Sequence, residues 1–352
     1  KEFYTFTIQQ TRLDLVKETL GVDSVNVIAD LGKLEFGRKR GYEVDRFEGS
    51  IPFLKVKNFT LSFPDAKVKA GVAEAQFYLK IFRDKRLPFK KSMKPLPIDA
   101  IRALPFELEI DSLKIIKSYV QYEEFGEEAP DPGGLYFDDL YAVLSNISST
   151  ATNGNMQLIA DAELMGQGDL SMAVTFPLVR NKRSTLVGSL QDFEMSRINP
   201  MIKPAANIEV ESGKMKKLSF NFTFNSVRSD GEIELNYEDL KLISYKDEDK
   251  DNDDELDKDN LKSFMMNTFV FRKNMDEGVP EEKRTGTVMF LRDENRSVLN
   301  FWVKSLLSGI KSAYKLDKAV EKEEQRELKK EERLSRRLER KLKKSEKKKD
   351  RG

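Results

Sequence analysis

The chain has 352 residues, with 61 Lys and Arg against 60 Asp and Glu, and it contains neither Cys nor His. Without Cys it forms no disulfide and no thiolate-ligated metal site. Without His it lacks the usual general base and the commonest transition-metal ligand, so Ser-His-Asp and Cys-His catalysis are excluded.

Residues 1–85 alternate between apolar and polar side chains in short runs separated by Gly, Pro, Asn and Asp. This pattern predicts short β-strands with turns between them. The predicted strands are Phe3–Ile8, Ser24–Ile28, Leu34–Phe36, Ile51–Val56, Phe59–Phe63 and Ala73–Phe82.

Residues 83–105 carry Pro88, Pro95, Pro97 and Pro105 among basic residues. Proline at this density does not fit a central strand, so we expect a crossing connection with one helical turn at Ile98–Leu104.

Alternation resumes at Phe106 and continues to Leu291, which indicates a long series of antiparallel strands with little helix between them. Such a series is typical of a sandwich, a barrel or an extended sheet. The predicted strands are Phe106–Ile110, Ser118–Phe125, Leu135–Leu144, Leu158–Leu164, Leu170–Phe176, Ser184–Leu190, Ile208–Val210, Leu218–Phe224, Glu232–Tyr237, Phe264–Arg272 and Thr285–Leu291.

The stretch from Leu190 to Ile243 contains the clearest one-sided strand. Its members Leu218, Phe220, Phe222 and Phe224 follow one another at a spacing of two, which places them on one face. A wide apolar face of this kind must meet a core, a partner or a lipid.

From Ser297 to Leu316, apolar residues recur every three or four positions, which predicts an amphipathic helix. Residues 315–352 contain 17 Lys and Arg against 10 Asp and Glu, a net charge of +7. This tail fits a solvated helix held by Glu–Lys pairs or a segment on anionic lipid headgroups. Its interspersed acids argue against nucleic acid as a partner.

The densest acidic run spans residues 246–260, and its Asp249, Asp251 and Asp253 match the first three ligand positions of a calcium loop. The match ends there, because Asp254 stands where Gly is needed and Asn260 where a bidentate Glu is needed. A solvated acidic loop is favoured over a weak calcium site. No other metal or cofactor site is predicted.

No apolar run approaches the roughly 18 residues that a transmembrane helix needs. The sequence opens with Lys1 rather than Met, from which we expect a processed chain or a fragment.

Several segments resemble bacterial AsmA-like proteins. The first is Leu104–Ile115 (LPFELEIDSLKI) followed by residues 118–124 (SYVQYEE), and the second is residues 134–148 (GLYFDDL…SNIS). The third and strongest combines Ile198–Pro204 (INPMIKP) with Ser212-Gly213 and residues 231–241 (GEIELNYEDLK), and Phe301–Ala313 is similar to the closing helix of that family.

The resemblance implies an elongated, strongly twisted antiparallel sheet curled into an open groove. It further implies a periplasmic protein of the Gram-negative envelope that moves phospholipid between the inner and outer membranes, without being an enzyme. AsmA-like proteins carry an amino-terminal membrane helix, which this sequence does not show. We therefore expect anchoring to the inner membrane through a segment outside it.

These expectations divide the chain into an N-terminal β segment (1–95), an AsmA-like β region (96–294), a closing helix (295–316) and a charged tail (317–352). An acyl chain gains about 0.8 kcal/mol per buried CH₂, so an apolar groove holds it without a charged site. The alternative is a structural protein of the envelope that uses its basic tail for contacts. The predicted groove residues are Leu218, Phe220, Phe222, Phe224, Ile233, Leu235, Leu170, Met172 and Val174.

Overall fold

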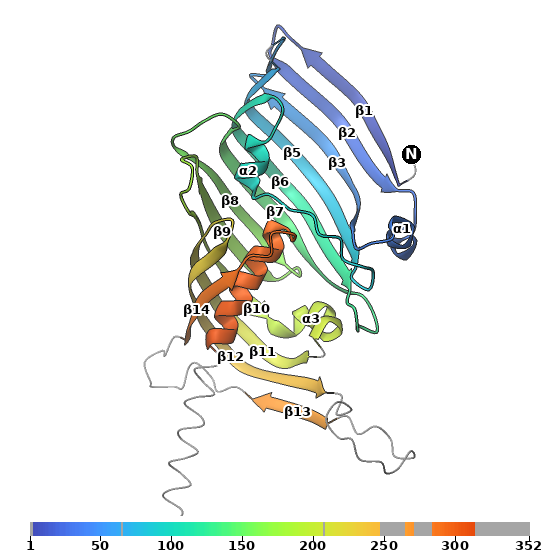
Figure 1. Cartoon of the computed structure of the whole chain (residues 1–352), viewed down its shortest axis with the longest axis vertical. Helices are drawn as coiled ribbons and strands as arrows, with labels where there is room; N and C mark the ends of the chain where they lie inside the picture. The colour runs from blue at the N-terminus through green and yellow to red at the C-terminus, as the bar shows by residue number, and fades with distance from the viewer. Residues whose placement is uncertain (1–2, 65, 207, 247–264, 271–283, 314–352) are drawn as a thin grey trace, which may run out of the picture.

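A computed structural model describes residues 3–64, 66–206, 208–246, 265–270 and 284–313. Within them the chain forms one large, mainly β structure, and a single sheet runs through both expected β segments (Figure 1). The neighbouring strands follow the order β1-β2-β3-β5-β6-β7-β8-β9-β10-β11-β12-β13, with β14 beside β12 and β4 beside β5.

The strands are β1 (Tyr4–Asp14), β2 (Thr19–Ala29), β3 (Asp45–Lys57), β4 (Thr60–Ser62), β5 (Lys67–Asp84), β6 (Glu107–Phe125), β7 (Gly133–Ser148), β8 (Asn155–Leu164), β9 (Gly168–Pro177), β10 (Ser184–Glu194), β11 (Ile208–Phe224), β12 (Arg228–Lys246), β13 (Met265–Val270) and β14 (Arg284–Leu291). The helical elements are α1 (Lys33–Arg40), α2 (Pro97–Arg102), η1 (Met195–Ile198) and α3 (Asn199–Ala206), followed by a helix over residues 298–313. We call this last element the closing helix.

The sheet is mixed, which corrects the expectation of a wholly antiparallel one. β5 and β6 pair in parallel from Lys67 beside Glu107 to Asp84 beside Phe125. Parallel neighbours need a connection that returns to the starting end of the sheet. The proline-rich segment provides it, and the predicted helical turn within it is confirmed as α2.

Several predicted strands are longer than expected because β-bulges interrupt their alternation. β6 joins two predicted strands across Lys117, which has a φ of 45°, and β7 shifts its register at Asp139, where φ is 43°. A bulge moves the apolar side chains from one sequence parity to the other. The apolar face of the sheet therefore stays continuous, although the alternation of apolar and polar residues in the sequence is interrupted.

The predicted strand at Leu34–Phe36 is wrong, because these residues lie in α1. Gly32 precedes this helix, Gly41 ends it in the left-handed conformation with φ 76°, and its last turn is basic. Glycine after the last turn and cations at the C-terminus both favour a helix. The alternation over Leu34–Phe36 covers only three residues, so it is a weaker signal than the two features that favour a helix.

The main buried cluster lies on one face of the sheet, which we call the inner face. α2, α3 and the closing helix contribute side chains to this cluster, including Ile98, Ile202 and Phe301. In Figure 1 the closing helix lies in front of the β10–β14 end of the sheet, and α2 lies in front of its middle.

Candidate apolar binding face

Two adjacent rows of directly paired residues cross the inner face at right angles to the strands. From β2 to β14 both rows contain only apolar side chains and glycine. The first is Leu20, Val56, Ala73, Leu113, Leu144, Leu158, Val174, Leu186, Phe222, Gly231 and Val288. The second is Val22, Leu54, Ala75, Ile115, Ala142, Ala160, Met172, Gly188, Phe220, Ile233 and Gly286.

Neighbouring strands lie about 4.8 Å apart, so ten spacings give the two rows a length of about 48 Å along the sheet. We call them together the apolar stripe. The residues between the two rows point to the opposite face, where Lys55, Glu74 and Lys114 pair across β3, β5 and β6. Over these strands the sheet is therefore apolar on one face and charged on the other.

The structure places all nine predicted groove residues on the inner face. Leu218, Phe220, Phe222, Phe224, Ile233, Leu235 and Val174 are buried, whereas Leu170 and Met172 are half-buried against the same cluster. Sequence alternation had placed these residues on a common face at the β9–β12 end, and their role in a groove stays a prediction. The alternation had not found Leu20, Leu54 or Leu113, which extend the same face to the other end, because only the strand register connects them.

At the β12–β14 end the closing helix covers the inner face. The ring of Phe224 contacts Phe301 and Trp302 with centroid distances of 6.0 and 5.8 Å. Ser229 and Ser305 share a buried hydroxyl–hydroxyl hydrogen bond of 2.7 Å. The predicted amphipathic helix is confirmed over its described residues, and its apolar face packs on these phenylalanines.

The closing helix also occupies the backbone edge of β14. Thr287 N–H donates to Ser312 Oγ and Met289 N–H donates to Ser308 Oγ, each at 3.2 Å. These amides point away from β12, and an unpaired strand edge of this kind attracts further strands. Two serine hydroxyls of the closing helix therefore accept hydrogen bonds from two N–H groups on the free edge of β14.

The β1 end is different, because only part of its apolar surface is buried. Leu20, Leu54 and Leu113 are half-buried around a small cluster formed by the buried Val56, Ala70 and Ala73. On β1 the side chains of Phe6 and Ile8 are 65% and 64% exposed, and they pair with Val27 and Val25 rather than with the stripe residues of β2. In Figure 1 none of the described helices crosses in front of β1 or β2. The apolar stripe is thus covered at one end and open at the other.

A charge network joins the start of β3 and the end of β5 to the turn before the closing helix. Arg83 forms two hydrogen bonds of 2.6 Å with Asp45, and Glu43 accepts hydrogen bonds from both Arg83 and Arg296. Burial alone lowers the pKa of Arg83, but pairing with Asp45 outweighs it and raises the pKa overall. The network fixes residues far apart in the sequence across the inner face.

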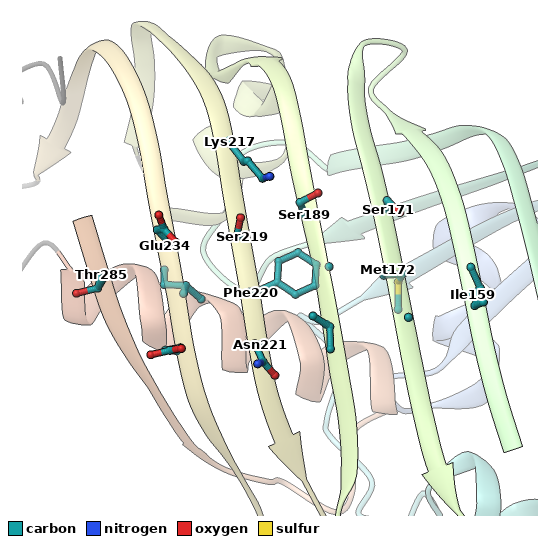
Figure 2. Close-up of a pocket in the computed structure, with 15 residues that line it drawn as sticks. Ile159, Ser171, Met172, Ser189, Lys217, Ser219, Phe220, Asn221, Glu234 and Thr285 are labelled. Atoms are coloured by element: carbon teal, nitrogen blue, oxygen red, sulfur yellow. The ribbon is translucent and has the colours of Figure 1, made fainter. Parts of the chain in front are cut away.

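A shallow depression of about 560 Å³ lies on the opposite face (Figure 2). Ser171, Ser189 and Ser219 pair side by side across β9, β10 and β11, and their small side chains leave the space. In Figure 2 the closing helix lies behind the strands that bear this depression. Met172, Gly188, Phe220 and Ile233 of the second row also line the depression, so only the sheet itself separates it from the inner face.

The segments that carry the resemblance to AsmA-like proteins have structural roles. Asn199 holds the backbone of β11, since its Nδ2 donates to Val210 O at 2.9 Å and its Oδ1 accepts from Val210 N–H at 2.8 Å. Ser212 Oγ donates to Asp239 O at 2.8 Å beside a bulge, where Gly213 has a φ of 139°. These residues shape the end of the sheet.

The calcium candidates Asp249, Asp251 and Asp253 and the basic tail lie outside the described residues. None of the helices in the described part of the chain is long and apolar enough to span a membrane. No family model matches the chain, and no curated protein matches it either.

Proposed function

We propose that the inner face binds the acyl chains of phospholipid and conducts the lipid along the sheet between the inner and outer membranes of a cell envelope. The observation that carries this proposal is the apolar stripe, whose two rows contain no polar side chain from β2 to β14. A periplasmic location and a role in outer-membrane assembly are supported by the resemblance to AsmA-like proteins.

The physical basis is the transfer of hydrocarbon out of water. Each CH₂ that leaves water contributes about 0.8 kcal/mol, so an acyl chain along the stripe is held without a charged or catalytic group. A contact of this kind does not depend on position along the stripe, because the rows repeat the same chemistry at every strand. The lipid is therefore able to slide from strand to strand while its headgroup stays in water.

The accessible part of the stripe is where lipid binds first. Leu20, Leu54 and Leu113 are half-buried at this end, whereas Phe222 and Phe224 lie under the closing helix. Of the predicted groove residues, Leu170 and Met172 are partly exposed, although both pack against the main buried cluster. Lipid reaches the buried phenylalanines only if the closing helix moves aside.

The test is lipid extraction from the purified chain, followed by mass spectrometry. We expect co-purified phospholipid, and we expect Leu54→Gln to reduce its amount several-fold because it places an amide in the stripe. The matched control is Lys55→Gln, which puts the same side chain one position later on the opposite face. Equal lipid content in the two variants would remove Leu54 from the binding face.

The second candidate is a non-catalytic structural protein of the envelope. The closed packing of Phe224 against Phe301 and Trp302 favours it, because this end of the sheet is a dry core. A chain that carries no lipid after purification, and takes up none from vesicles, would favour this candidate over lipid transfer.

A further inference from the structure

The open end of the sheet presents exposed apolar side chains at the tips of two neighbouring connections. In the β1–β2 turn, Leu15 is 71% exposed and Val16 is 95% exposed. In the connection between β3 and β5, Phe63 is 78% exposed. We call these three side chains the apolar tips.

The two connections lie next to each other at the same end of the strands (Figure 1). Phe59 N–H donates to Glu18 O at 2.8 Å, which joins the segment before β4 to the end of the β1–β2 turn. Thr19 and Lys57 pair directly where β2 begins and β3 ends. The tips therefore belong to one corner of the sheet.

Two backbone N–H groups of the β1–β2 turn are paired within the turn, while its side chains are exposed. Asp14 Oδ1 accepts hydrogen bonds from Val16 N–H at 3.0 Å and from Lys17 N–H at 2.9 Å. Backbone groups that are already paired cost little to move into an apolar medium, whereas unpaired ones cost several kcal/mol. The turn thus holds Leu15 and Val16 outward in a form suited to an apolar environment.

We infer that this corner inserts its apolar tips into the surface of a phospholipid bilayer. Protruding side chains on two narrow turns offer much less than the roughly 800 Å² per partner of a stable protein interface. A bilayer needs no complementary shape and accepts such side chains at the boundary between headgroups and acyl chains. The exposed Lys57 flanks the tips, as does Lys17, whose side chain is 79% exposed and lies 3.8 Å from Asp14 Oδ2; both amines are placed to meet lipid phosphates.

The position of the corner connects it to the apolar stripe. Leu13 is 50% exposed at the end of β1 and pairs directly with Leu20, the first residue of one row of the stripe. An acyl chain that leaves the bilayer at the tips therefore meets Leu13 and then Leu20. This role as an entry point for lipid rests on the proposed function. Contact between the corner and the bilayer does not, because vesicle binding is measured separately from lipid content.

The experiment is co-flotation of the purified chain with vesicles of phosphatidylethanolamine and phosphatidylglycerol at a ratio of three to one. The variants are Leu15→Asp/Val16→Asp and, independently, Phe63→Asp. The matched control is Val227→Asp, in the β11–β12 turn at the far end of the sheet. Val227 is 60% exposed, and its N–H and that of Arg228 donate to Asn225 Oδ1 as those of Val16 and Lys17 do to Asp14. Circular dichroism and lipid content are recorded for every variant.

We expect the wild type and Val227→Asp to float, and the tip variants to lose vesicle binding at least tenfold while they keep their fold. Flotation of both tip variants at the wild-type level would overturn the inference. An equal loss of vesicle binding in Val227→Asp would also overturn the inference, as would a wild-type chain that does not float with the vesicles. A wild type that floats through its tips but contains no lipid leaves the bilayer contact in place and contradicts the proposed function alone.

Discussion

Gly286 of β14 lies against Gly309 of the closing helix so closely that a Cβ on Gly286 would overlap the Gly309 carbonyl oxygen. A Cβ on Gly309 would in turn approach both branches of the Ile233 side chain to 3.0 Å. The pair of glycines thus allows the helix to lie directly on the sheet. The closed end of the apolar stripe depends on this contact.

We expect Gly286→Ala to lower the free energy of unfolding by about 2 kcal/mol, because the helix must move outward to make room for the methyl group. Trp302, the only tryptophan in the chain, sits in this helix and reports the change through its fluorescence during urea unfolding. The control is Gly21→Ala in β2, where a Cβ meets no atom within 4 Å. Equal stability of the two variants would contradict the close packing.

The second prediction concerns Asn199. Its side chain pairs with the N–H and C=O of Val210 in the way that the backbone of a neighbouring strand would. Asn199→Ala removes both hydrogen bonds and leaves the N–H and C=O of a buried residue without these partners. An unsatisfied buried group costs about 1–3 kcal/mol, so we expect a loss of about 2 kcal/mol in urea unfolding. Asn221→Ala, at an exposed position of the same strand, should change stability by less than about 0.5 kcal/mol.

Which face of the strands is apolar was predictable from the sequence at the β9–β12 end. Phe220, Phe222 and Phe224 alternate with polar residues, and this alternation survives because no bulge falls among them. The closing helix was equally clear from its spacing of three and four. Both patterns involve residues close together in the chain, so they are visible in a single sequence.

The length of the apolar stripe was not predictable, because it depends on register and on bulges. Lys117 and Asp139 adopt positive φ without glycine, so no residue type marks the places where the alternation changes parity. The parallel pairing of β5 and β6 likewise follows from the crossing connection as a whole. The contact of the closing helix with Phe224 required the tertiary structure.

The third prediction concerns Glu43, whose side chain is 3% exposed between Arg83 and Arg296. Glu43→Gln keeps the shape but removes the negative charge, so two guanidinium groups remain with less compensation. Removing one partner from a buried ion pair is strongly destabilising, and we expect a loss of about 3 kcal/mol. Trp302 fluorescence should show the transition at lower urea, because Arg296 lies just before the closing helix. The exposed Glu232→Gln is the control, and a matching effect there would argue against the network.

The last prediction is a pH dependence at Asp84, a buried carboxylate at the end of β5. Arg86 Nε and Nη2 donate to its two oxygens at 2.8 Å each. The hydrogen bonds from Arg86 lower the pKa of Asp84 below its ordinary value of 3.8. A carboxyl group whose pKa is lower in the folded state stabilises the fold above its unfolded pKa, and this contribution disappears as the pH falls through the folded value.

The measurement compares the wild type with Asp84→Asn in urea unfolding at pH values from 7 down to 2.5. At pH 7 we expect the variant to be less stable by about 1.5 kcal/mol, the size of a hydrogen bond to a charged group. The difference should stay constant down to about pH 5 and shrink below pH 3.8, since Asp84 of the unfolded wild type then binds a proton that the folded state still lacks. Asp169→Asn, at an exposed strand position, is the control. A difference for Asp84→Asn that persists unchanged at pH 2.5 would mean that the carboxylate charge does not stabilise this end of β5.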